Sequence, residues 1–226
     1  HGMIKNISNL GDAALYCDFG KEVNKDTNTK VIKYFKSIKK ENILGIDNLT
    51  PSYNKLIISF DLKKTSYQSI KNLIEKLDID TNDDLKNKKI EVPVCISDDF
   101  SLDIRRLEQN LKISREKIYE NFFNKEFFCY MTGFIAGMPF LGDLDFNMRA
   151  KRLETPRVKV PKGSVGLTEQ FANIYTFESP GGWNIIGNTP LNIFDNSKET
   201  DPNLINPGDI ITFKEITLDQ YRNYNE

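Results

Sequence analysis

Apolar and polar positions follow two different patterns along the chain. Apolar residues recur at helical spacing over residues 26–40, with lysines on the opposite face, and again over 66–77, which predicts two amphipathic helices. Loose alternation over 4–19 and the β-rich run over 54–61 predict strands. Strands and helices that alternate in this way are typical of a small α/β domain.

The second part of the chain has a different pattern of apolar residues. Residues 90–96 form a strand-like run, and 101–111 and 114–123 have the spacing of short helices, with Ser114 placed as an N-cap. Beyond them, short apolar runs separated by Gly, Pro and Asn continue over 127–213. This pattern predicts a closed or sandwiched β domain.

The polar, turn-rich segment 82–89 is the best candidate for a linker. We therefore predict an N-terminal α/β domain over residues 3–88 and a β domain over 89–226. A chain of 226 residues is long enough for two small domains that each bury a core.

Composition and charge exclude several classes of partner. With 31 basic and 32 acidic residues, the net charge of −1 gives no overall attraction to nucleic acid or anionic lipid. No apolar run approaches the roughly 18 residues of a membrane span, and the start has no long apolar segment. We expect a cytoplasmic protein that binds neither nucleic acid nor membranes.

Cysteine and histidine usage limits the chemistry further. Cys17, Cys95 and Cys129 are widely separated, which indicates neither a disulfide framework nor a thiolate metal site. The single histidine is His1, which precedes Met3 as the remnant of a purification tag would. Without it, a Ser-His-Asp system and a histidine-ligated metal are excluded, and no metal site is predicted.

The densest motif lies within 177–195, where Ser179 opens the sequence Ser-Pro-Gly-Gly-Trp. Gly181 and Gly182 allow positive φ, so we expect consecutive backbone N–H groups to form a concave site for an anion. Trp183, the only tryptophan, follows directly. The alternative is a simple turn beside a core aromatic residue.

Two more motifs precede it, Thr-Pro-Arg-Val-Lys-Val-Pro-Lys-Gly-Ser-Val-Gly over 155–166 and Gly-Phe-Ile-Ala-Gly-Met-Pro-Phe-Leu-Gly over 133–142. In this order and spacing, the three motifs resemble those of the allophanate hydrolase subunit 1 family, which includes the B subunits of 5-oxoprolinases and sporulation-kinase inhibitor proteins. Residues 10–20 and 45–61 resemble the family's N-terminal strand motifs. The resemblance therefore covers nearly the whole chain.

The resemblance implies an α+β fold, in which a small α/β N-terminal domain precedes a β-barrel domain resembling cyclophilin. It implies a subunit of an ATP-dependent amide or lactam hydrolase, with 5-oxoprolinase, which opens 5-oxoproline to glutamate, as the leading identity. The implied partners are a sister subunit of the allophanate hydrolase subunit 2 type and a third subunit. ATP is assigned to the complex, because no Gly-x-x-x-x-Gly-Lys-Ser/Thr loop occurs here.

Two alternatives come from the same family. One is a non-catalytic module that inhibits a sensor histidine kinase, and the other is a carboxyltransferase-like subunit of urea or allophanate degradation that uses biotin from another chain. The family's usual His is replaced by Phe122, and an Arg in its last motif is replaced by Asn188. These two changes favour the non-catalytic alternative.

Candidate site residues follow from the three motifs. Arg157 offers a planar fork of donors for a carboxylate or phosphate, although a structural ion pair explains it equally well. Glu178 is a candidate base or orienting group, and the serines have no neighbouring base to activate them. We expect catalytic roles for Arg157 and Glu178 and substrate-binding roles for Ser164, Ser179, Gly181, Gly182, Trp183, Thr189, Phe134 and Phe140.

Overall fold

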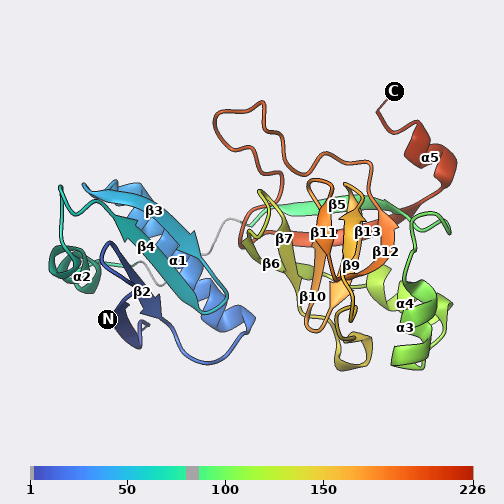
Figure 1. Cartoon of the computed structure of the whole chain (residues 1–226), viewed down its shortest axis with the longest axis horizontal. Coiled ribbons are helices and arrows are strands. Elements are labelled where there is room, and N and C mark those ends of the chain that lie inside the picture. The colour runs from blue at the N-terminus through green and yellow to red at the C-terminus, as the bar shows by residue number, and fades with distance from the viewer. Residues whose placement is uncertain (1–2, 80–86, 226) are drawn as a thin grey trace. The chain divides into compact units, whose positions relative to one another are not determined.

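The chain divides into two compact units, residues 1–86 and 87–226 (Figure 1). The computed structural model describes residues 3–79 and 87–225. Most of the predicted linker, residues 82–86, lies outside the described part of the chain.

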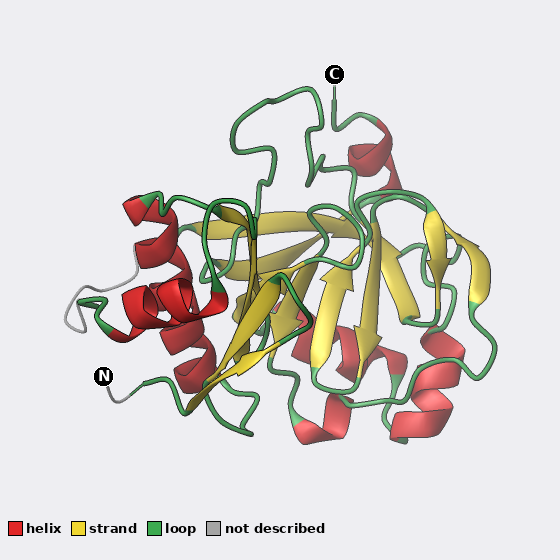
Figure 2. Cartoon of the chain, turned by 60° about the vertical axis from the view of Figure 1, so that its left-hand side comes forward, coloured by secondary structure: helices red, strands yellow, loops and turns green. Residues whose placement is uncertain are grey.

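The N-terminal unit is an antiparallel sheet of four strands covered by two helices. The strands run in the order β1-β2-β4-β3, with bounds β1 Asn6–Asn9, β2 Ala14–Asp18, β3 Ile46–Pro51 and β4 Lys55–Phe60. Helices α1 (Lys25–Glu41) and α2 (Tyr67–Glu75) lie on the same face of this sheet (Figure 2). Their apolar faces share one core with alternate residues of β2 and β4.

Local signals explain where these helices begin. The Asn24 side chain accepts a hydrogen bond from the N–H of Thr27 at the start of α1, and Ser66 does the same for Ser69 at α2. Helix α1 ends at Asn42, which adopts the left-handed conformation. Both predicted helices are confirmed, as is the strand pair expected over residues 4–19.

The C-terminal unit is built around a closed barrel of seven strands in the order β10-β7-β6-β13-β5-β12-β9. Strand β5 pairs with β13 in parallel along its whole length. The expected α+β fold with a β-barrel is confirmed. The strands are β5 Lys89–Cys95, β6 Phe127–Thr132, β7 Pro139–Gly142, β9 Ser164–Thr168, β10 Phe171–Ile174, β12 Asn184–Asn188 and β13 Ile210–Ile216.

A second, two-stranded sheet lies outside the closed barrel. It consists of β8 (Arg157–Val160) and β11 (Ser179–Gly181), and we call it the β8–β11 ribbon. The remaining elements are the helices α3 (Ile104–Leu111), α4 (Arg115–Phe123) and α5 (Leu218–Arg222) and the short 3-10 helix η1 (Phe146–Met148). Helices α3 and α4 lie together beside the barrel in both views (Figures 1 and 2).

Helix α4 shows why the position of the family's histidine carries no chemistry here. Ser114 caps this helix as predicted, accepting from the N–H of Lys117. Phe122 is fully buried, and its ring stacks on Phe213 with the centroids 4.5 Å apart. It also packs against Phe127, so the position belongs to the barrel core.

The three cysteines are free and buried. Over residues 3–79 and 87–225, no helix has the length and apolar character needed to cross a membrane.

Candidate substrate site

Arg157, at the start of β8, is held by a buried carboxylate. Its Nη1 and Nη2 donate to the two carboxylate oxygens of Asp103 at 2.6 and 2.5 Å, and the Asp103 side chain is 5% exposed. Asp103 also accepts from the N–H of Ile185 at 2.7 Å. Hydrogen bonding to Asp103 raises the pKa of the Arg157 guanidinium. The ion pair therefore fixes the predicted catalytic arginine between α3, β8 and β12.

The positive φ expected at Gly181 and Gly182 is absent from the structure. Gly181 belongs to the extended strand β11 and lies opposite Arg157 in the ribbon, which accounts for its negative φ. Gly181 is needed for a different reason: a Cβ there would overlap the Tyr175 hydroxyl and lie 2.9 Å from its Cζ. A Cβ on Gly182 would meet nothing closer than 3.7 Å.

Trp183 and Phe140 form an apolar wall. Trp183 is 5% exposed, and its ring meets the Phe140 ring edge-on, with the centroids 5.8 Å apart. The Trp183 Cβ lies so close to Gly166 that a Cβ on this glycine would be 2.9 Å away. Two residues expected from separate motifs are thus brought together.

Asn173 Oδ1, Tyr175 Oη and Ser179 Oγ are buried polar atoms without a hydrogen-bond partner among the described residues. We call them the polar cluster. Asn173 Oδ1 abuts Gly166, and Tyr175 Oη abuts Gly181, two residues after Ser179. Buried polar atoms in native proteins are nearly always paired, so these three, on or next to the consecutive strands β10 and β11, mark a candidate site for a polar ligand.

The Tyr175 hydroxyl is a hydrogen-bond donor at neutral pH. Burial raises its pKa, while the Asn173 amide, the charge of Arg152, the N–H of Trp183 and the charge of Arg157 act in the opposite direction. Although the Asn173 amide and the Trp183 N–H lie near the hydroxyl, neither meets it in hydrogen-bonding geometry. Because the net effect raises the pKa, the phenol keeps its proton.

Asn173 and Tyr175 were not predicted from the sequence. They stand two residues apart at the end of β10, so their side chains project from the same side of the strand. That spacing, one strand before the Ser-Pro-Gly-Gly-Trp motif, is the signal that could have indicated them.

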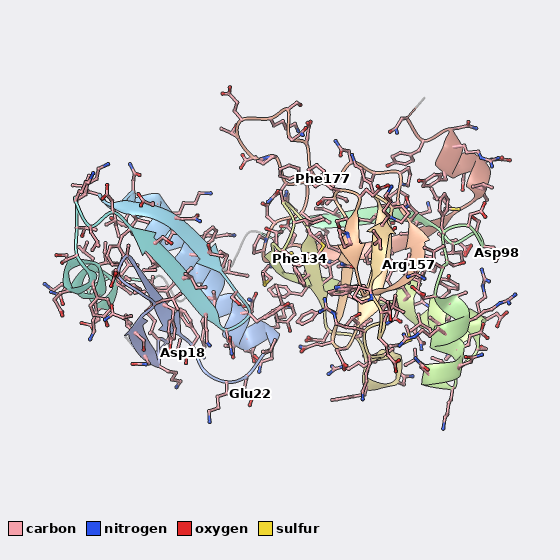
Figure 3. All side chains as sticks on the ribbon, viewed as in Figure 1. Asp18, Glu22, Asp98, Phe134, Arg157 and Phe177 are labelled. Carbon is pink, nitrogen blue, oxygen red and sulfur yellow. The ribbon has the colours of Figure 1, made fainter. Side chains whose placement is uncertain are left out.

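Two predicted residues lie away from the polar cluster. Glu178 is exposed. Phe134 is 77% exposed on the loop between β6 and β7, and it lies apart from Arg157 (Figure 3). The structure therefore does not bring either side chain into the buried part of the site.

Ser164 and Thr189 lie on the paired strands β9 and β12 and just beyond. Both are buried, and Thr189 Oγ1 accepts from the N–H of Leu191. Thr189 lines a pocket of about 430 Å³ together with Tyr175 and Arg222. This pocket contacts the polar cluster only through Tyr175.

Asn188, at the position of the family's arginine, has a structural role. Its Nδ2 donates to the carbonyl of Lys162 at 3.0 Å, and its Oδ1 accepts from the Tyr221 hydroxyl at 2.8 Å. Asn188 thus ties helix α5 to the barrel. In the described part of the chain, no three His, Cys, Asp or Glu side chains are grouped as metal ligands would be.

Comparison with known proteins agrees with this architecture. Residues 5–205 match the family model described as "Carboxyltransferase domain, subdomain C and D". The chain is 30% identical to the 5-oxoprolinase B subunit of Bacillus subtilis, covering 97% of this chain and 96% of the relative. It is 29% identical to the 5-oxoprolinase B subunit of Haemophilus influenzae, covering 92% and 96%.

Among solved structures, the crystal structure of TTHA0988 in space group P212121 superimposes with a TM-score of 0.81 at 26% identity. The match covers 90% of this chain but only 40% of that one, so this chain spans less than half of TTHA0988. The family resemblance carried by the sequence motifs is confirmed. The chain belongs to the carboxyltransferase domain family, subdomains C and D.

Proposed function

We propose that this chain is the B subunit of a cytoplasmic 5-oxoprolinase, an enzyme that opens 5-oxoproline to glutamate at the expense of ATP. Two relatives, both named as B subunits of 5-oxoprolinase and each aligned over nearly its full length, support this choice. On this proposal, a sister subunit of the allophanate hydrolase subunit 2 type and a third subunit complete the enzyme.

The observation that carries the proposal is the polar cluster beneath the Ser-Pro-Gly-Gly-Trp motif. Its atoms are buried and have no hydrogen-bond partner among the described residues, and the aromatic wall of Trp183 and Phe140 lies beside them. A small polar ligand with an apolar ring satisfies both features. 5-Oxoproline has this character.

Positive charge near the polar cluster would attract the carboxylate of the substrate. Arg152 and Arg157 both act on the Tyr175 hydroxyl through their positive charge. The charge of Arg157 is largely balanced by Asp103, so the positive potential here comes from the exposed Arg152 and from Arg106, which donates to the Arg152 carbonyl. The substrate's carboxylate would lie on this side of the site.

The chemistry that this chain supplies is binding and polarisation. Hydrolysis of the ring amide adds water across the C–N bond, and the ring nitrogen leaves as the amine of glutamate. Buried hydroxyl donors stabilise negative charge that develops on the carbonyl oxygen. Glu178 is exposed, so its proposed role as a polar helper requires that the substrate meets it at the surface shared with a sister subunit.

The test is ATP-dependent release of glutamate from 5-oxoproline by this chain mixed with its sister subunits, each omitted in turn. The proposal expects release that requires ATP and stops when this chain is left out. Release at an unchanged rate without this chain would refute the proposed function, and so would a stable complex that leaves 5-oxoproline intact.

A further inference from the structure

The β8–β11 ribbon covers the polar cluster. Ser179 and Gly181 belong to β11, and the Gly181 backbone rests directly on the Tyr175 hydroxyl. The pairing register of the ribbon shifts between Ser179 and Gly181, so the two strands are not regularly joined at this point. A ligand that reaches the cluster must therefore lie under the ribbon.

Three contacts hold the ribbon and its flanks in place. The Arg157–Asp103 ion pair fixes β8, and the N–H of Leu153 donates to the carbonyl of Gly182 at 2.8 Å. The third is the packing of Gly181 on Tyr175. In none of these contacts does an atom of the polar cluster form a hydrogen bond. Holding the ribbon in place therefore does not require the hydrogen-bonding capacity of these atoms.

The hydrogen-bonding capacity of the cluster defines the ligand's chemistry. Asn173 presents its Oδ1 as an acceptor, since its Nδ2 faces the Met138 sulfur at 3.5 Å. The hydroxyls of Tyr175 and Ser179 act as donors. The cluster thus offers one acceptor and two donors without a formal charge.

An amide matches this inventory. It has one N–H for an acceptor and one carbonyl oxygen with two lone pairs for two donors. A carboxylate or a phosphate dianion has no proton to give to Asn173 and would leave that oxygen unpaired and buried, at a cost in binding. The cluster therefore discriminates in favour of an amide.

We propose that Asn173, Tyr175 and Ser179 form the subsite for the amide of a lactam, with its N–H on Asn173 Oδ1 and its carbonyl oxygen on the two hydroxyls, under the β8–β11 ribbon. Trp183 and Phe140 contact the ring. The choice of a lactam rests on the proposed function, whereas the choice of an amide rests on the cluster alone.

Trp183 provides the measurement, because it is the only tryptophan in the chain and lies beside the cluster. Its fluorescence is recorded while the full chain is titrated with 5-oxoproline, with 2-pyrrolidinone, which has the amide but no carboxylate, and with proline, which has no amide. Both lactams should change the emission, and proline should not. Emission that responds to neither lactam, or equally to proline, would overturn the subsite.

The variant Tyr175→Phe separates ligand binding from structure. It removes a buried hydroxyl with no protein partner, so its melting temperature should equal or exceed that of the wild type. Its affinity for both lactams should fall about tenfold or more. Unchanged lactam affinity in Tyr175→Phe would overturn the proposal.

Tyr119→Phe is the matched control. The Tyr119 hydroxyl is also buried but donates to the carbonyl of Ile186 at 2.7 Å. This variant should lose stability and bind lactams as the wild type does. If Tyr175→Phe instead lost as much stability as Tyr119→Phe, the Tyr175 hydroxyl would be structural and the proposal would be wrong.

The binding experiment and the turnover experiment test separate claims, so one claim can be refuted while the other stands. Lactam binding that depends on Tyr175, without release of glutamate by the complex, would refute the proposed function and leave the amide subsite standing. Glutamate release together with lactam binding that is indifferent to Tyr175 would refute the subsite and leave the function.

Discussion

Arg157 and Asp103, which are 54 positions apart in the chain, meet in two parallel hydrogen bonds of 2.6 and 2.5 Å. The carboxylate is buried, and the guanidinium is partly exposed. Because Asp103 also accepts from the N–H of Ile185, one side chain connects the start of α3 to both the ribbon and the barrel. The geometry of the candidate site depends on this junction.

Removing either partner should destabilise the C-terminal unit. Asp103→Ala leaves Arg157 and the Ile185 N–H without their acceptor, and we expect a loss of about 3 kcal/mol in the free energy of unfolding. Arg157→Lys keeps the positive charge but not the planar pair of donors, and it should lose less free energy of unfolding than Asp103→Ala. Urea unfolding measures both, and an unchanged midpoint in Asp103→Ala would contradict the role assigned to the ion pair.

The contact between Gly181 and Tyr175 predicts a steric coupling. Gly181→Ala places a methyl group on the Tyr175 hydroxyl and should cost about 1–3 kcal/mol. Adding Tyr175→Phe removes the atom that clashes most, so the double variant should recover about 1 kcal/mol of this loss. A double-mutant cycle by urea unfolding measures the coupling.

Gly182→Ala is the control for this cycle. Its new methyl group would meet no atom closer than 3.7 Å, so it should not show the same loss or any coupling to Tyr175→Phe. If Gly181→Ala and Gly182→Ala lost equal free energy of unfolding, the loss would come from the strand conformation and not from the contact with Tyr175.

Cys17 should make stability depend on pH. Burial raises the pKa of its thiol from 9.0 to about 12. The stabilisation is complete below pH 9 and is lost as the pH rises towards 12, because the unfolded state releases its proton first. Relative to Cys17→Ala, the wild type should be less stable by about 2 kcal/mol at about pH 10.5 than at about pH 7. Urea unfolding at the two pH values tests this, and a constant difference would contradict it.

Tyr221 should anchor helix α5. Its hydroxyl donates to the buried Asn188 Oδ1, and its ring lies 4.6 Å from that of Phe100 between centroids. Tyr221→Phe leaves the Asn188 oxygen without this donor and should cost about 1–2 kcal/mol. Tyr224→Phe changes a tyrosine that is 42% exposed and should cost nothing measurable. Urea unfolding compares the two, and equal midpoints would show that the Tyr221 hydroxyl is not an anchor.

The helices were predictable because their signals are local. Residues 26–40 carry an amphipathic period, and the structure places α1 over Lys25–Glu41. The barrel was also predictable as a class, since short apolar runs separated by Gly and Pro indicate strands that close on each other. The order of its strands depends on contacts between distant residues, which these patterns do not contain.

The site was only partly predictable for the same reason. The motifs indicated Trp183 and Phe140, which do meet. They did not indicate Asp103, because its pairing with Arg157 exists only in the folded chain. The sequence indicated Gly181 because glycine allows positive φ. The structure instead requires glycine at this position because a Cβ would overlap the Tyr175 hydroxyl.

On our central proposal, this chain contributes an amide site to an ATP-dependent hydrolase. The most direct test is the rate of glutamate release from 5-oxoproline by the complete complex, assembled with either the wild-type chain or Ser179→Ala. Ser179 Oγ has no partner among the described residues, so this variant should fold and assemble normally. With ATP present, we predict a rate that is lower than the wild-type rate by about tenfold or more. A rate equal to that of the wild type would contradict the proposal.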